Sequence, residues 1–193
     1  MSLTTLDIKE PGLNILPPGV ERHVVNAGGL TGLQIFPDDE IEIINDEGNQ
    51  ICEIICFDKD GKSELAILSL KENSNKSFIK EILKKKDESS LATNFQLKKR
   101  NLDLNKSHSS ILFDEKTPSG EKIKLKSKDK CYVIFSAPQN DMLVSEQNPS
   151  GDLILFVKRA KITNDKELSI IPDPVFEPHY EKNIDRQTAI SFQ

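Results

Sequence analysis

Two β-rich runs separated by a turn, within residues 37–57 (PDDEIEIINDEGNQICEIICF), constrain the fold of this chain more than any other stretch. The runs at residues 41–45 and 51–57 are rich in isoleucine, whose branched side chain suits a pleated strand and loses rotamer freedom in a helix. The intervening residues 46–49 (DEGN) are a turn signal, because Gly and Asn tolerate positive φ. The pattern predicts a β-hairpin at the centre of a mostly β domain.

Other stretches extend the β prediction along the chain. Strand patterns occur at residues 23–26, 33–35, 65–70, 111–113, 122–126, 131–136 and 153–157. Residues 73–88 predict one helix, with Ser74 or Asn75 as its cap, and a second helix pattern covers residues 90–100. The expected fold class is mainly β, a β-sandwich or barrel-like domain with one or two helices, and α+β is the alternative label.

Proline positions divide the chain into three parts. Residues 1–22, with prolines at 11, 17 and 18, predict an N-terminal arm that packs on the domain. Residues 23–171 predict a single β-rich domain, which is the size that one core can support. Residues 172–193 predict a Pro-rich linker and the start of a further domain, so the chain reads as a truncated protein or an excised domain.

Charge and hydropathy restrict the partners that we expect. The chain holds 26 Lys and Arg against 31 Asp and Glu, for a net charge of −5, whereas nucleic-acid binding relies on clustered cations. Its apolar runs are far shorter than a membrane span, and the first residues lack the pattern of a secretory signal. We therefore expect a cytoplasmic protein with no nucleic-acid and no membrane partner.

The sequence offers no catalytic or metal-binding set by spacing alone. Cys52 and Cys56 would lie on one face of a strand but roughly 13 Å apart, too far to share one zinc ion. Cys131 lies in another apolar run, and an odd count of three cysteines predicts reduced, buried thiols. The acidic residues 38–40 resemble a solvated turn. No metal site is predicted.

Several short motifs carry a family resemblance in their order along the chain. They are GLNILPP (12–18), GVERH (19–23), GGLTG (28–32), GNQ (48–50), SAP (136–138), QNP (147–149) and DLILFVKRA (152–160). Together they resemble the N-terminal segment of large bacterial aminomethyltransferase-like proteins, related to the T protein of the glycine cleavage system. In those proteins a urea-carboxylase-associated domain follows, and then a folate-binding domain.

The predicted hairpin is also similar to that associated domain. Its pattern of a strand, Glu-Gly-x-Gln and a second strand with an acidic residue and Phe matches Glu47, Gly48, Gln50, Glu53 and Phe57. The family's further Cys, His-Asp and Cys-x-x-Asn features are missing, so no ligands are carried over. The resemblance implies a divergent copy that keeps the scaffold and has lost the site.

Two functions follow as hypotheses. The first, which we prefer, is a non-catalytic accessory or ligand-binding β domain of one-carbon and amine metabolism. This domain would bind no cofactor itself, and tetrahydrofolate would bind only in a downstream domain. Its partners would be downstream domains of the same polypeptide or a partner protein. The alternative is a small metabolic enzyme acting on an amine or urea-type substrate. In that case Gln50, Glu53 and His108 would line the ligand pocket.

Overall fold

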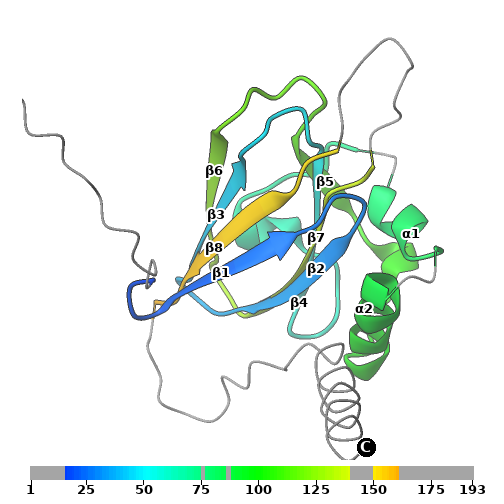
Figure 1. Cartoon of the computed structure of the whole chain (residues 1–193). Helices are drawn as coiled ribbons and strands as arrows, with labels where there is room; N and C mark the ends of the chain where they lie inside the picture. Colours follow the sequence, from blue (N-terminus) through cyan, green and yellow to red (C-terminus); the bar gives the residue numbers. More distant parts are fainter. Residues whose placement is uncertain (1–15, 75–76, 86–87, 140–149, 161–193) are drawn as a thin grey trace, which may run out of the picture.

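Eight strands form two four-stranded sheets in the computed structural model, which describes residues 16–74, 77–85, 88–139 and 150–160 (Figure 1). The first sheet has the order β1 (Val20–Val25), β8 (Leu153–Lys158), β3 (Glu40–Asn45), β6 (Glu121–Lys126). The second sheet has the order β2 (Leu30–Ile35), β7 (Cys131–Ser136), β4 (Cys52–Asp58), β5 (Ser109–Phe113). All six strand pairs are antiparallel. The expected mainly β fold class is confirmed.

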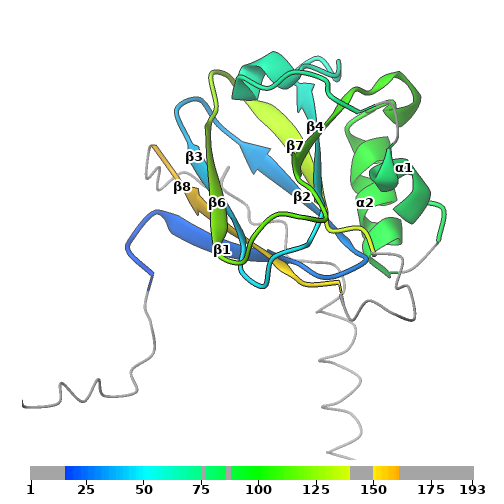
Figure 2. The ribbon, with the colours of Figure 1, turned by 90° about the horizontal axis from the view of Figure 1, so that it is seen from above.

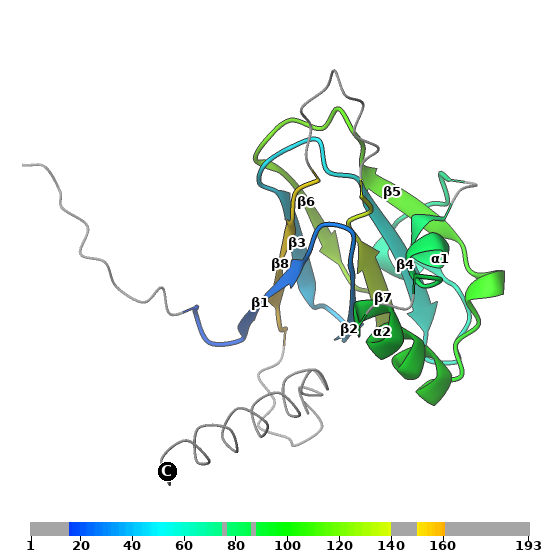
Figure 3. The ribbon, with the colours of Figure 1, turned by 45° about the vertical axis from the view of Figure 1, so that its right-hand side comes forward.

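Helices cover the outer face of the second sheet, so this sheet lies between two packed layers. Figures 2 and 3 show α1 (Phe78–Ile82) and α2 (Glu88–Lys99) on the side of β4 and β7 that faces away from the first sheet. The core between the sheets includes Ile41, Ile54 and Leu155, and a second cluster under the helices includes Phe57 and Ile79. The domain therefore has three layers and two apolar interfaces.

The residues of strand β4 alternate between the two apolar interfaces. Cys52, Ile54 and Cys56 point into the core between the sheets, whereas Ile55 and Phe57 pack under the helices. Alternate residues of a strand face opposite sides, so a strand that is covered on both sides must be apolar throughout. This explains the continuous apolar run, and it confirms the prediction that Cys52 and Cys56 share one face.

The predicted hairpin at residues 37–57 is wrong, although both of its strands exist. β3 pairs with β6 and β8 in the first sheet, and β4 pairs with β5 and β7 in the second. The connection between them crosses from one sheet to the other, with the Asn45 side-chain amide donating to the Gln50 carbonyl at 2.8 Å. Gly48 and Asn49 do adopt positive φ, as the turn signal predicts. The turn residues indicate a reversal but not which strands will pair.

The helix predictions also need correction. The helix expected over residues 73–88 shortens to α1, whose cap is Ser77, because Ser74 forms an isolated bridge with Ser109 and Asn73 bonds the backbone of Ile111. The second helix pattern becomes α2, the longer helix. Residues predicted as a strand at 65–70 form the 3-10 helix η1 (Leu65–Leu68).

The predicted domain boundaries fall partly outside the described residues. β1 begins at Val20, so the last residues assigned to the arm form a strand of the first sheet. Residues 1–15 and 161–193 are not described, and the predicted arm, linker and further domain stay predictions there. No helix in the described ranges is long and apolar enough to cross a membrane.

Candidate functional site

A buried acid, Glu53, lies near the start of β4 on the face that α1 and α2 cover. Its side chain is fully buried, with 0% exposure. The β4–β5 register shifts here, since Cys52 pairs with Phe113 but Glu53 pairs with Ile111, which leaves Leu112 as the extra residue. Such bulges redirect side chains and are frequent beside active sites. The bulge places the carboxyl between β5, β7 and the start of α1.

Two donors bind one oxygen of this carboxyl. Glu53 Oε2 accepts a 2.7 Å hydrogen bond from the backbone N–H of Ile79 and a 3.5 Å hydrogen bond from the Ser136 hydroxyl. Oε1 accepts no hydrogen bond of normal geometry from the described residues. An ionised carboxylate has about four acceptor sites, and the hydroxyls of Ser77 and Ser109 and the backbone of Phe78 also lie close enough to Glu53 to lower its pKa.

The surroundings favour the protonated acid. Burial raises the pKa of the Glu53 carboxyl above its ordinary value, because the charged form loses its hydration. Hydrogen bonds from the backbone of Ile79, the hydroxyls of Ser109 and Ser77, and the backbone of Phe78 lower the pKa and offset part of that effect. A buried acid with a raised pKa is a feature of sites that hold or transfer protons.

An open hollow of about 260 Å³ shares two neighbours with this acid, although Glu53 is not itself a lining residue. Phe78 and Ile111, which line the hollow, are also neighbours of Glu53, the first through its backbone and the second as the cross-strand partner. The remaining lining residues are Ile51, Asp114, Glu115 and Lys116. A lining with an aromatic ring, two isoleucines, two carboxylates and one lysine suits a small methylated cation or dipole.

Gln50, the second predicted site residue, is also fully buried but has its polar atoms occupied. Its side-chain Nε2 donates to the carbonyls of Ile51 and Pro138, both at 2.9 Å. Its Oε1 accepts from the backbone N–H of Gly151 at 2.9 Å. Because Pro138 and Gly151 flank residues 140–149, Gln50 holds together the two ends of that segment. Its ligand-binding role stays a prediction.

His108, the third predicted residue, lies in a different environment. Its side chain is 58% exposed, and Nδ1 is 2.9 Å from the Glu72 carboxylate. No hydrogen bond or ion pair joins His108 to Glu53 or Gln50 within the described ranges. The adjacent Ser109, not His108, contributes a hydroxyl that lowers the Glu53 pKa. The structure therefore places Gln50 and Glu53 in one buried segment and His108 at the surface.

The thiols and acids of the described residues do not cluster into a metal site. No group of three or more His, Cys, Asp or Glu side chains among the described residues could hold a metal ion. All three cysteines are free and buried, as predicted. Cys56 lies within hydrogen-bonding reach of Cys131, whose sulfur is also 3.5 Å from the Ser127 hydroxyl. This contact with Cys131, together with burial, raises the pKa of the Cys56 thiol above its ordinary value.

Sequence reasoning missed a second polar cluster, centred on Arg159. Its guanidinium binds both oxygens of Glu21 at 2.8 Å and Asp39 Oδ2 at 2.7 Å. Asp39 is only 2% exposed, so the expectation that residues 38–40 form a solvated turn is wrong for this residue. The partners are 138 and 120 residues from Arg159 in sequence, and no local pattern signals such a pairing.

Comparison with known proteins identifies one relevant relative. No family model matches the chain. The chain is 29% identical over 185 residues to the trimethylamine-oxide aldolase of Ruegeria pomeroyi. The match covers 96% of this chain but 23% of that protein, so the chain spans less than a quarter of the length of the relative.

This relative corrects the functional expectations. The resemblance to aminomethyltransferase-like proteins and to the urea-carboxylase-associated domain is wrong, because the match over nearly the whole chain is to a protein of a different function. The preferred hypothesis of a non-catalytic accessory domain is overturned as well, since the relative is an enzyme. The relative is bacterial, as are the proteins that the sequence motifs resemble. The match favours the alternative hypothesis, a small amine-metabolising enzyme.

Proposed function

We propose that this chain acts in amine metabolism as an enzyme, or as part of one, whose substrate is a small methylated amine oxide or a related methylated amine. The observation that carries the proposal is the 29% identity to trimethylamine-oxide aldolase over 96% of the chain. The chain matches only 23% of that protein, so the proposal concerns the contribution of this part.

We assign the substrate contact to the hollow beside Glu53. Phe78, Ile51 and Ile111 supply an apolar surface for N-methyl groups, and an aromatic ring attracts the positive end of such a dipole. Asp114 and Glu115 add negative charge among the lining residues. A small hollow is sufficient for a methylated amine oxide, because a trimethylated nitrogen group has only a few heavy atoms.

We assign the proton chemistry to Glu53. Its raised pKa keeps a proton on the carboxyl at higher pH than in a solvated glutamate, and Oε1 has no partner of normal geometry among the described residues. A protonated carboxylic acid can donate a hydrogen bond to the oxygen of an amine oxide, which a carboxylate would repel. Glu53 is thus the candidate acid of the site.

We also propose a cellular location and partners for this protein. We place the protein in the cytoplasm, which the three free, buried cysteines support. A downstream domain of the same polypeptide or a separate protein as partner stays a prediction, as does the expectation that this chain carries no cofactor of its own.

Ligand-detected NMR with trimethylamine oxide tests the proposal. Saturation of protein resonances should transfer to the N-methyl signal with the wild-type chain, and the transfer should fall at least several-fold in Phe78→Ala and in Glu53→Gln. Lys124→Ala, on an exposed position of β6 in the other sheet, is the matched control and should leave the transfer unchanged. Circular dichroism checks that each variant is folded.

Turnover is followed in the same samples as loss of the N-methyl signal together with release of a trapped aldehyde. The absence of both saturation transfer and turnover at millimolar trimethylamine oxide with the wild-type chain would overturn the proposal. Transfer that is equal in all four proteins would overturn the assignment of the site to the hollow.

A further inference from the structure

Helix α2 exposes two large hydrophobic side chains to solvent. Leu91 is 57% exposed and Phe95 is 59% exposed, although both are large hydrophobic side chains. Their spacing of four residues places them side by side on one face of the helix. The opposite face buries Ser90, Thr93 and Leu97 against the sheet. We call the pair Leu91 and Phe95 the α2 surface.

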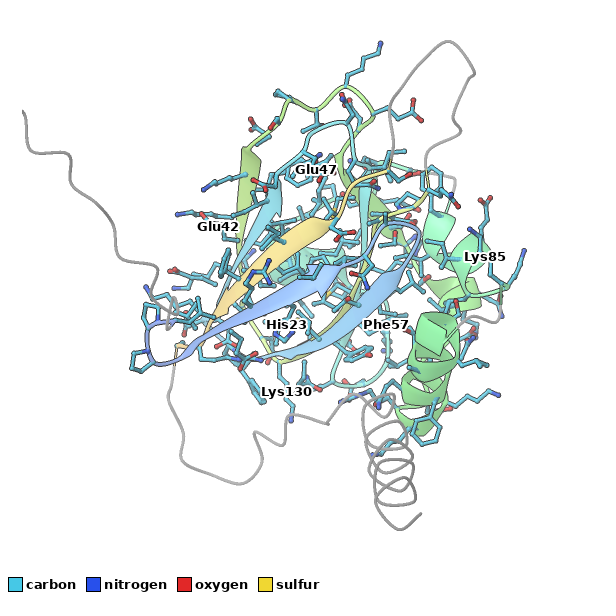
Figure 4. All side chains as sticks on the ribbon, in the orientation of Figure 1. His23, Glu42, Glu47, Phe57, Lys85 and Lys130 are labelled. Carbon is cyan, nitrogen blue, oxygen red and sulfur yellow. The ribbon has the colours of Figure 1, made fainter. Side chains whose placement is uncertain are left out.

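Positive charge borders the α2 surface. Lys98 and Lys99 are exposed in the last turn of α2, one turn beyond Phe95. Lys84 and Lys85 are exposed after α1, and the adjoining Leu83 carbonyl accepts from Asn94 of α2 at 3.4 Å. Figure 4 shows Lys85 projecting outward on the helical side of the molecule. An apolar patch bordered by lysines suits an apolar partner with acidic residues.

The last described residues and the end of α2 share one contact residue, Gln34. The Arg159 guanidinium donates to the Gln34 carbonyl at 2.9 Å, and the Ala160 N–H donates to Asp39 at 2.9 Å. Arg100, the residue that follows α2, donates to the Gln34 side chain at 2.6 Å. Gln34 therefore contacts both Arg159, which follows β8, and Arg100, which follows α2.

The sequence of the next residues complements the α2 surface. Residues 167–177 (ELSIIPDPVFE) contain Leu168, Ile170, Ile171, Val175 and Phe176, three acidic residues, and no Lys or Arg. The eight steps from Ala160 to Leu168 can span up to about 28 Å, whereas a 12-residue helix is about 18 Å long. The reach of the linking residues therefore exceeds the length of α2 itself.

We propose that residues 167–177 of this chain dock on the α2 surface, with apolar side chains on Leu91 and Phe95 and acidic residues near Lys98 and Lys99. The docking removes exposed apolar area from water, and the lysines select an acidic segment over a basic one. The contact is made within one molecule, because the segment belongs to the same chain as α2 and tethering by a short linker raises its effective concentration to about the millimolar range. The inference is independent of the proposed function.

Photo-crosslinking in the full-length chain tests this docking. The photoreactive amino acid p-benzoylphenylalanine replaces Phe95, whose exposure leaves room for it, and the cross-linked peptides are mapped by mass spectrometry. Cross-links should join position 95 to residues 167–177 of the same molecule, with a yield that does not depend on protein concentration. The double variant Ile170→Asp/Phe176→Asp should lower that yield about tenfold.

Two controls make the outcome decisive. Ile190→Asp changes an apolar residue outside the segment and should leave the yield unchanged. The same photoreactive residue at Lys124, on the other sheet, should give no cross-link to residues 167–177. Cross-links only between two molecules, with a yield that rises with concentration, would assign the α2 surface to a second copy and overturn the proposal. A map from position 95 that lacks residues 167–177 would overturn it too.

Discussion

Glu53 and Ser136 lie directly opposite each other on β4 and β7, and the Ser136 hydroxyl donates a 3.5 Å hydrogen bond to Glu53 Oε2. Both side chains are fully buried, on the face of the second sheet that the helices cover. The central strands of the second sheet, β4 and β7, thus contain one acid and one hydroxyl partner on a face that is otherwise mostly apolar. Burying an acid costs free energy unless its environment or a proton compensates, so this position is where function is most expected.

Glu53→Gln should change how stability depends on pH. The folded-state pKa of Glu53 is raised, so the wild-type domain carries an unfavourable charge at high pH. That penalty is relieved as pH falls through the raised pKa and is absent below the ordinary value of 4.5. We expect the free energy of unfolding of wild type, relative to Glu53→Gln, to increase as pH falls across this window.

Urea denaturation from pH 8 to pH 4 measures that difference. Glu53→Asp keeps a titrating carboxyl on the same strand and is the matched variant, which should retain a pH dependence of the same sign. Parallel pH profiles for wild type and Glu53→Gln would mean that Glu53 does not titrate in the folded state as inferred.

Arg159→Ala should destabilise the domain by about 3–5 kcal/mol, because Asp39 would remain buried without its cation. Arg159→Lys should recover part of this, since an ammonium cannot bind Glu21 and Asp39 as a planar fork does. Lys158→Ala, the neighbouring residue, breaks an exposed 3.8 Å pair with Glu40 and should change stability by less than about 0.5 kcal/mol. Chemical denaturation measures all three, and equal effects of Arg159→Ala and Lys158→Ala would contradict the role of the cluster.

Glu21 should stabilise the domain only above mildly acidic pH. The hydrogen bond with His23 (labelled in Figure 4) lowers the pKa of Glu21 most, partial burial opposes this, and the contact with Arg159 lowers it further, to about 2. Its contribution is therefore present above pH 4.5 and is lost as pH falls from 4.5 to about 2. Since the group is partly exposed, Glu21→Gln should cost about 1 kcal/mol at pH 7.

Thermal denaturation of Glu21→Gln and wild type at pH 7 and near pH 2 checks this prediction. The difference in melting temperature should be present at pH 7 and should shrink toward zero at the lower pH. A difference that stays constant across the range would show that the carboxylate charge is not what stabilises the fold here.

Gln50→Ala should destabilise the domain by about 2–4 kcal/mol, because it removes three hydrogen bonds and leaves the Pro138 carbonyl and the Gly151 N–H without this partner. Gln50→Glu should also destabilise, since it keeps an acceptor for Gly151 but loses both donors. Hydrogen exchange should increase at Gly151 in both variants. Lys122→Ala, exposed on β6, is the control, and unchanged exchange at Gly151 in Gln50→Ala would contradict the clamp.

Local sequence signals predict individual elements well where the chain is bounded by clear turns. The strand predicted at residues 131–136 matches β7, because an apolar run stands between a charged turn and Ala137-Pro138. Local sequence signals fail where a side chain bonds a partner that is distant in sequence. Residues 73–77 read as helix, yet the Asn73 side chain exchanges two hydrogen bonds with the backbone of Ile111, 38 positions away.

The sequence by itself determined that the chain is mainly β, since branched apolar runs between turns can bury their side chains only on sheets. It also singled out Gln50 and Glu53 for attention. Only the tertiary structure decided which strands pair, because β3 and β4 have similar patterns and their separation into two sheets depends on β6, β8, β5 and β7, all distant in sequence. The environments of Glu53, Asp39 and Arg159 were decided in the same way, because burial and ion pairing arise between segments that are distant in sequence and brought together by folding.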